Sequence, residues 1–154
     1  MINNDVIRSI RYTLNISETK LLDIITLGGG SVVPTELTSF LKREDEPGYV
    51  ECNKKVMSQF LNGLIYFRRG KDLNRPPLKF EPLNNNLILK KLRVAFELKD
   101  DDILSILEKS EFKISKSELS ALFRKEGHEN YRACGDQVLR YFLAGLSFKL
   151  RPSL

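Results

Sequence analysis

The run Phe60-Leu61-Asn62-Gly63-Leu64 recurs as Phe142-Leu143-Ala144-Gly145-Leu146, and this recurrence decides the fold. Sliding the chain by 82 positions places residues 3–69 on residues 85–151 without a gap, and 16 of the 67 pairs are identical. A copied unit keeps its own apolar pattern, and units this small gain stability by burying their remaining apolar faces on each other. The sequence therefore predicts helical repeat 1 over 3–69, a Pro-containing basic linker over 70–84 and helical repeat 2 over 85–151.

Apolar residues recur at helical spacing in four segments of each repeat. In repeat 1 these segments contain Val6–Leu14, Leu21–Ile25, Leu37 and Val56–Leu64, and repeat 2 matches them 82 positions later. Ser17 suits an N-cap of the second helix, and Ser115 with Glu118 forms the pattern of a capping box before the third helix of repeat 2. We find no strand pattern. The expected fold class is all-α, with two homologous four-helix repeats and pseudo-two-fold packing across the long fourth helices.

Glycines mark two features of this pattern. Gly63 and Gly145 fall inside the fourth helices, where glycine costs about 1 kcal/mol relative to alanine, so their presence in both copies indicates a close approach between helices. Gly28-Gly29-Gly30 matches neither glycine-rich phosphate-binding motif, and no strand precedes it. Termination of the second helix is the expected role of this run.

Few residues have the chemistry of a catalytic or metal site. Cys52 and Cys134 precede the fourth helices, where a helix N-terminus can activate a thiol, but each is more simply a small buried apolar residue. His128, the only histidine, is expected to lie in an exposed loop. We predict no catalytic residue, no metal site and no cofactor.

Arg11 and Arg93 occupy the same position in the two copies, as do Glu44 and Glu126. They are expected to form one structural ion pair twice. A duplicated acid or anion site is the alternative interpretation.

A concentration of positive charge lies across the joint between the repeats. Residues 65–93 carry a formal charge of +6, in a chain whose total is +5. Tyr66, Phe67 and Phe80 accompany the cations and offer rings on which unpaired bases stack. Tyr66 and Phe67 are alternatively core residues, and the linker is alternatively a solvated connector. The candidate nucleic-acid-binding residues are Arg68, Arg69, Lys71, Arg75, Lys79, Lys90, Lys91 and Arg93.

The chain resembles the YehS family of small bacterial cytoplasmic proteins in the runs Phe60–Tyr66, Arg69–Asp72, Asn84–Asn86, Leu89–Arg93, Cys134–Gln137 and Leu139–Leu143. The resemblance covers essentially the whole chain, including the duplication. It implies an all-helical fold built from two copies of one domain, and it carries over no activity, cofactor or catalytic residue. Copy one departs from copy two at Gly28-Gly29-Gly30, where copy two has Ser110-Glu111-Phe112, so the two copies need not share one role.

Composition places the chain among globular proteins, with 42% hydrophobic and 29% charged residues. The N-terminus lacks a basic start followed by an apolar run, and no stretch approaches the roughly 18 apolar residues of a membrane span, so we expect a cytoplasmic protein. The favoured function is a non-catalytic binding or adaptor module. The alternatives are a nucleic-acid-binding protein that uses the basic joint and, third, a small cysteine-dependent enzyme. The partner is accordingly a protein or a nucleic acid, and the oligomeric state is left open.

Overall fold

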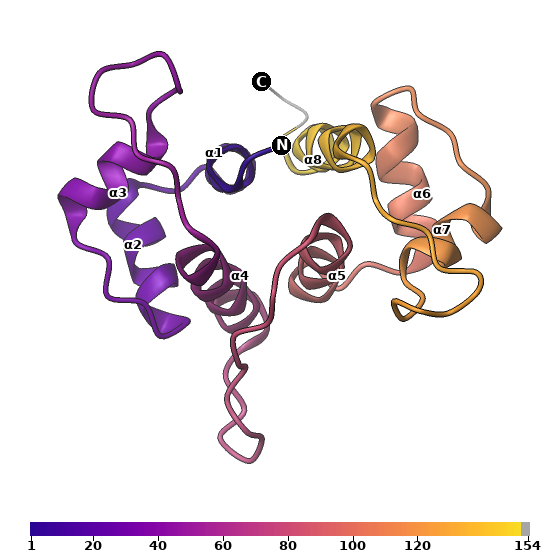
Figure 1. Cartoon of the computed structure of the whole chain (residues 1–154), viewed down its shortest axis with the longest axis horizontal. Coiled ribbons are helices and arrows are strands. Elements are labelled where there is room, and N and C mark those ends of the chain that lie inside the picture. The colour runs from indigo at the N-terminus through magenta and orange to yellow at the C-terminus, as the bar shows by residue number, and fades with distance from the viewer. Residues whose placement is uncertain (152–154) are drawn as a thin grey trace. The chain divides into compact units, whose positions relative to one another are not determined.

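The computed structural model describes residues 1–151, and these form eight α-helices and no strand. Unit 1, Met1–Leu83, contains α1 (Asn3–Leu14), α2 (Glu18–Leu27), α3 (Pro34–Leu41) and α4 (Lys54–Arg69). Unit 2 begins at Asn84 and contains α5 (Asn85–Ala95), α6 (Asp100–Lys109), α7 (Lys116–Leu122) and α8 (Asp136–Leu150), in the same order (Figure 1). An all-α chain with two four-helix repeats is thereby confirmed. The pseudo-two-fold packing of the repeats stays a prediction.

The helices begin where the sequence places their caps. The Ser17 hydroxyl accepts a hydrogen bond from the Lys20 amide at 3.1 Å, and Ser115 and Glu118 accept from each other's amides at 3.0 and 3.1 Å. At the start of α3, Pro34 is the first helical residue and Glu36 accepts from the Val33 amide at 3.2 Å. Since valine carries no acceptor, α3 has only half of the capping box that begins α7.

Each unit buries its own apolar core, to which all four of its helices contribute. In both units the second and fourth helices pack against each other, and Phe60 and Phe142 are fully buried at equivalent positions. The core of unit 1 includes Ile7, Ile10, Leu21, Ile24, Leu37, Phe60, Leu61 and Leu64. The core of unit 2 includes Leu89, Leu92, Ile103, Ile106, Leu119, Phe142, Leu143 and Leu146.

Glycine permits the close crossing of the second and fourth helices. A Cβ atom placed on Gly63 would lie 1.8 Å from the carbonyl oxygen of Ile24, and one on Gly145 would lie 1.9 Å from that of Ile106. Both distances are far inside van der Waals contact, so the predicted close helix approach is confirmed in each unit. Gly28 ends α2 as predicted, because its amide bonds back to the Ile24 and Ile25 carbonyls.

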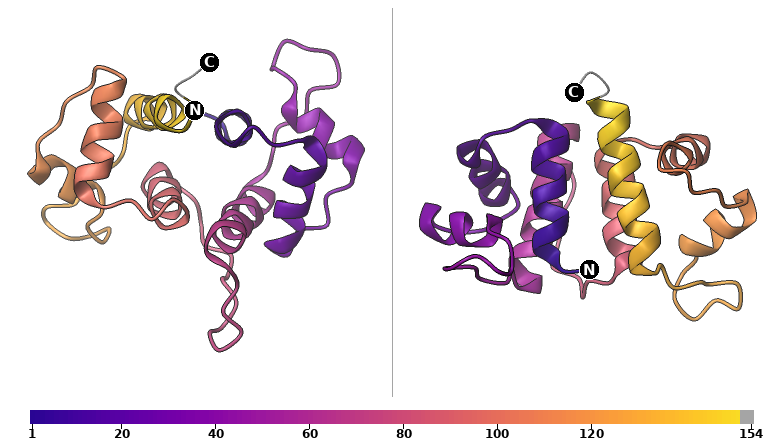
Figure 2. Two further views of the ribbon diagram at one scale, coloured as in Figure 1. Left: turned by 180° about the vertical axis from the view of Figure 1, so that it is seen from behind. Right: turned by 90° about the horizontal axis from the view of Figure 1, so that it is seen from above.

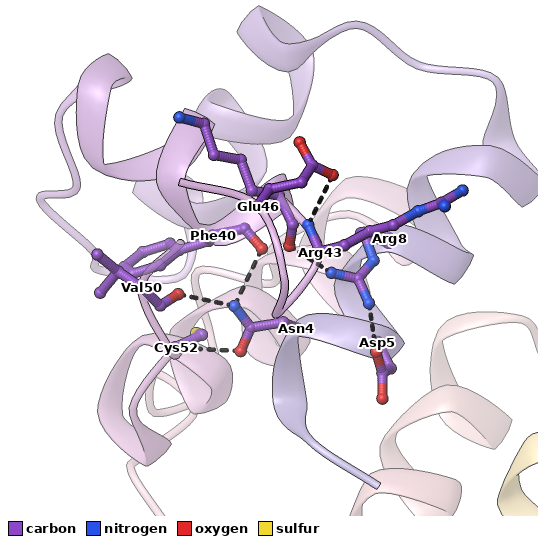
Figure 3. A network of polar contacts seen from close by, with 9 residues as sticks. Asn4, Asp5, Arg8, Phe40, Arg43, Glu46, Val50 and Cys52 are labelled. Atoms are coloured by element: carbon purple, nitrogen blue, oxygen red, sulfur yellow. Dashed lines mark hydrogen bonds and ion pairs between the residues drawn. The ribbon is translucent and has the colours of Figure 1, made fainter. Parts of the chain in front are cut away.

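An asparagine, buried in unit 1 and half-buried in unit 2, fixes the loop between the third and fourth helices of each unit. In unit 1, the Asn4 amide group donates to the carbonyls of Phe40 and Val50 at 3.0 and 2.9 Å, and its oxygen accepts from the Cys52 amide at 2.8 Å (Figure 3). Asn86 makes the same three bonds in unit 2, to Leu122, Arg132 and Cys134. Asparagine supplies two donors and an acceptor in one plane, which explains why both copies carry it.

The segment after α4 is not the simple extended linker that its prolines predict. Beyond Gly70 the chain runs outward, turns at Asp72–Arg75 and doubles back toward α4 (Figures 1 and 2). The Asn74 amide bonds to the Asp72 carboxylate at 2.9 Å, and the Arg75 amide bonds to the Asp72 carbonyl at 3.2 Å. We call residues 70–83 the connector. The connector belongs to unit 1, because its second half, which runs back toward α4, is hydrogen-bonded to that helix.

Candidate nucleic-acid interface

The cations of unit 1 that the sequence singled out lie at the end of α4 and along the connector. Arg68, Arg69, Lys71, Arg75 and Lys79 are all exposed. Arg75 forms an ion pair of 3.4 Å with Asp72 on the same turn, and the Lys71 ammonium lies 5.2 Å from the centre of the Tyr66 ring. Because the connector turns back toward α4, these five cations belong to one folded segment rather than to a free tether.

Exposed apolar side chains accompany these cations. Phe80 is 57% exposed, Phe67 is 41% exposed and Leu73, near the turn, is 88% exposed. Tyr66 is half-buried, and its hydroxyl accepts a hydrogen bond from the Leu78 amide. Of the three rings proposed for stacking, Phe67 and Phe80 therefore have accessible surface, whereas Tyr66 serves mainly to hold the connector.

The three predicted cations that follow the connector, all on α5, differ in their exposure to solvent. Lys90 is exposed on α5, but Lys91 is only 9% exposed. Arg93 is half-buried, pairs with Asp100 at 2.9 Å and lies over the Phe123 ring at 4.7 Å. Lys91 and Arg93 therefore present little surface to a ligand, whereas Lys90 is accessible. The role of these residues in nucleic-acid binding stays a prediction.

Arg11 and Arg93 have a shared structural role, but with other partners than Glu44 and Glu126. Arg11 lies 3.9 Å from Glu18, and the equivalent Arg93 pairs with the equivalent Asp100. Each arginine thus meets the first residue of the following helix, whose N-terminus also favours a negative charge. The duplicated ion pair exists, and the choice of its acidic partner was wrong.

Both thiols are buried. Burial, followed by the negative charge of Glu51, raises the pKa of Cys52 to about 12, and burial followed by Asp136 raises the pKa of Cys134 to about 11. A thiol with so high a pKa is almost entirely protonated at neutral pH, whereas a nucleophile or a metal ligand must be a thiolate. The structure therefore confirms the interpretation of these cysteines as small buried residues.

His128 lies in an exposed turn, as expected. Its Nδ1 atom accepts a hydrogen bond from the Asn130 amide at 3.0 Å, which occupies one of the two ring nitrogens in the turn itself. Across residues 1–151, no three side chains of His, Cys, Asp or Glu gather closely enough to hold a metal ion.

A shallow pocket of about 270 Å³ lies in unit 2 between Phe112, Leu122 and Val138. Its charged groups are Glu118 and Arg132, which lie 3.6 Å apart. Hydrogen bonding to Ser115, above all the bond that its amide donates to the Glu118 carboxylate at 3.1 Å, holds the pKa of Glu118 below its usual range, so this carboxylate is committed to the cap of α7. The polar groups of the pocket therefore serve the fold.

Three residues near the connector were not singled out as functional by the sequence. Lys20 lies over the Phe67 ring at 5.4 Å and adds a cation from α2, a contact between distant segments that no local pattern signals. Asn62 donates to the Lys79 carbonyl at 3.3 Å. The sequence did contain a sign of this role, because Asn62 aligns with Ala144 and is the one residue that differs within the best-matched block of the two copies. Leu73 is exposed only because the connector turns at this point.

Comparison with known proteins agrees with the internal duplication. A family model described as "Protein of unknown function (DUF1456)" matches residues 3–70 and again residues 85–151. The chain is 48% identical to the "Uncharacterized protein YehS" of Escherichia coli (strain K12) over 148 residues, which cover 96% of this chain and 95% of that protein. No solved structure matches the chain. Since the two matches lie within one residue of the repeat boundaries expected from the sequence and cover nearly all of the chain, the protein belongs to the DUF1456 family, of which it carries two copies of the domain.

Proposed function

We propose that this protein is a non-catalytic, cytoplasmic binding module whose connector surface binds single-stranded nucleic acid. The connector surface is defined as Arg68, Arg69, Lys71, Arg75 and Lys79 together with Phe67 and Phe80. The observation that carries the proposal is the presence of exposed cations and exposed aromatic rings on one folded segment. Among residues 1–151, no helix is both long and apolar enough to cross a bilayer.

The non-catalytic part of the proposal rests on where the repeated polar residues are used. Asn4 and Asn86 fix loops, and Arg11 and Arg93 pair with the acid that begins the next helix. The cysteines that both copies share are buried and protonated. The asparagines, arginines and cysteines that the two copies share at these positions thus serve the fold.

The choice of a single strand rests on the rings. Lysine and arginine neutralise phosphates of any nucleic acid, but only unpaired bases stack on an aromatic side chain, at about 1–3 kcal/mol per base. Phe80 is more than half exposed and lies beside Lys79 in the sequence. A duplex would use the cations and leave this ring in water, so the combination favours a single strand.

A protein partner is the second candidate, and Leu73 favours it. Burial of a leucine that is 88% exposed would contribute about 1.5–3 kcal/mol to an apolar contact with another protein. In that case the surrounding cations would select an acidic partner surface, and Leu73 rather than Arg75 or Lys79 would dominate the affinity.

The deciding experiment is a titration of fluorescently labelled single-stranded RNA and DNA, with a duplex for comparison, at several salt concentrations. Each phosphate that the protein neutralises contributes about 0.7 to the slope of log affinity against log salt for a single strand. Arg75→Gln/Lys79→Gln is expected to weaken binding and to reduce the slope by about 1.4 if both side chains meet phosphates. Both residues are exposed, so the melting temperature is expected to stay unchanged.

The matched control is Lys113→Gln/Lys125→Gln, which removes the same two charges from exposed positions of unit 2. It is expected to leave the salt slope as it is. If the two double variants behave alike, the attraction is a property of net charge and the connector surface is not the site. Failure of the unaltered protein to bind any strand at low salt would remove the nucleic-acid proposal, and loss of a captured protein partner on Leu73→Ser would then establish the second candidate.

A further inference from the structure

Two side chains of α4 hold the returning half of the connector. The Leu78 amide donates to the Tyr66 hydroxyl at 2.6 Å, and the Asn62 side-chain amide donates to the Lys79 carbonyl at 3.3 Å. The first bond satisfies a main-chain donor and the second a main-chain acceptor, on consecutive residues. Together with the turn at Asp72–Arg75, they define one path for a segment that contains Pro76 and Pro77 and no regular secondary structure.

Unit 2 shows which residues the fourth helix carries at the equivalent positions. The residues equivalent to Asn62 and Tyr66 are Ala144 and Phe148, neither of which has a polar side-chain atom. Ala144 is exposed whereas its equivalent Asn62 is only 3% exposed, and Phe148 is 55% exposed whereas its equivalent Tyr66 is half-buried. The helical unit therefore folds with alanine and phenylalanine at these positions. Their replacement by asparagine and tyrosine in unit 1 coincides with the two hydrogen bonds to the connector.

We propose that Asn62 and Tyr66 are positioning residues that hold the connector surface in its binding conformation. This inference rests on the proposed function. The two hydrogen bonds of Asn62 and Tyr66 with the connector are made by residues that unit 2 replaces with alanine and phenylalanine. A connector released from α4 would spend only a fraction of its time in the bound shape. Since the apparent dissociation constant rises in inverse proportion to that fraction, anchoring strengthens binding without adding a contact to the ligand.

The sharpest variant is Tyr66→Phe, which carries the residue of unit 2. It removes one hydroxyl but keeps the ring, so the cation–π contact between the Lys71 ammonium and that ring is retained. Asn62→Ala, again the residue of unit 2, removes the second anchor. The double variant is expected to weaken binding of a labelled single-stranded oligonucleotide roughly three- to tenfold. The salt slope is expected to stay the same, because every cation is still present.

Hydrogen exchange measured by NMR reports on the anchor without any ligand. The Leu78 amide is expected to be protected in the unaltered protein and to exchange at the rate of a free loop amide in Tyr66→Phe. In Arg75→Gln/Lys79→Gln the pattern should reverse, with the Leu78 amide still protected and the salt slope reduced. A lost charge and a lost anchor are therefore distinguished by two independent measurements.

Three results would overturn the inference. Unchanged protection of the Leu78 amide in Tyr66→Phe would show that the hydroxyl does not hold the connector. Lost protection with unchanged affinity would show that the connector is held but that its position is irrelevant to binding. Binding absent from the unaltered protein, with the anchor intact, would remove the proposed function and leave these residues a purely structural role. Because Tyr66→Phe keeps the ring of α4, it remains informative even if Asn62→Ala impairs folding.

Discussion

Replacing Gly63 by alanine tests the helix crossing on which each unit depends. The new Cβ atom would lie 1.8 Å from the Ile24 carbonyl oxygen, against about 3.4 Å for an ordinary contact, so α2 and α4 must separate by more than 1 Å. Overpacking of a core typically costs about 1–3 kcal/mol, and a clash with main chain belongs at the upper end. Alanine returns about 1 kcal/mol through its higher helix propensity. The expected net loss in the free energy of unfolding is therefore about 2 kcal/mol.

Urea unfolding followed by circular dichroism measures this loss, and Gly145→Ala repeats the test in unit 2, where the Cβ distance to the Ile106 carbonyl is 1.9 Å. The control is Gly135→Ala, since a Cβ at that N-cap position meets nothing within 4 Å. The control is expected to change stability by less than about 1 kcal/mol. A Gly63→Ala protein as stable as the unaltered one, or more stable by the full propensity gain, would show that the helices do not approach as closely as described.

Three further predictions follow from single residues. Asn4→Ala should cost about 3 kcal/mol or more in urea unfolding, because it leaves the Cys52 amide and two carbonyls without their partner, whereas Asn3→Ala removes only one bond. Glu111→Gly should raise the free energy of unfolding by about 0.5–1 kcal/mol, and the melting temperature with it, because φ is +61° at this position and glycine adopts such an angle without strain. Stability should fall as pH rises above about 9, because Cys52 and Cys134 keep their protons until about pH 12 and 11 in the folded protein, whereas the thiols of the unfolded chain lose theirs near pH 9. Cys52→Ala/Cys134→Ala should make the free energy of unfolding less dependent on pH in this range.

The architecture was predictable because the duplication allowed each helix signal to be checked twice. Ser115 with Glu118 and the repeated Gly63 and Gly145 are local or pairwise signals, and the structure uses them as expected. The long-range use of Asn4 was not predictable from the repeat alone. Its identity in both copies showed that it matters, but not that it reaches a loop nearly fifty residues away.

The candidate site was predictable only in outline. Charge density located the connector, yet it failed to separate Arg75, which is exposed, from Arg93, which pairs with Asp100. Exposure depends on which face of a helix turns inward, and a count of charges carries no such information. The prolines correctly excluded a helix, but the fold of the connector depends on Tyr66, which accepts a bond from a residue twelve positions later.

Differences between the copies carry as much information as identities, once each difference has a structural cause. Gly28 leaves room for the Gln59 carbonyl in unit 1, whereas Ser110 at the equivalent position donates to the Tyr141 carbonyl. Both residues thus accommodate the contact between the second and fourth helices, glycine by its small size and serine by a hydrogen bond, so this difference requires no functional explanation. Asn62 and Tyr66 differ from it, because their hydrogen bonds go to the connector, which lies outside the repeat. A residue difference that faces the core adjusts packing, whereas a difference that contacts a segment outside the repeat indicates what that copy does alone. On this argument the separate role of unit 1 is to be sought at its connector surface.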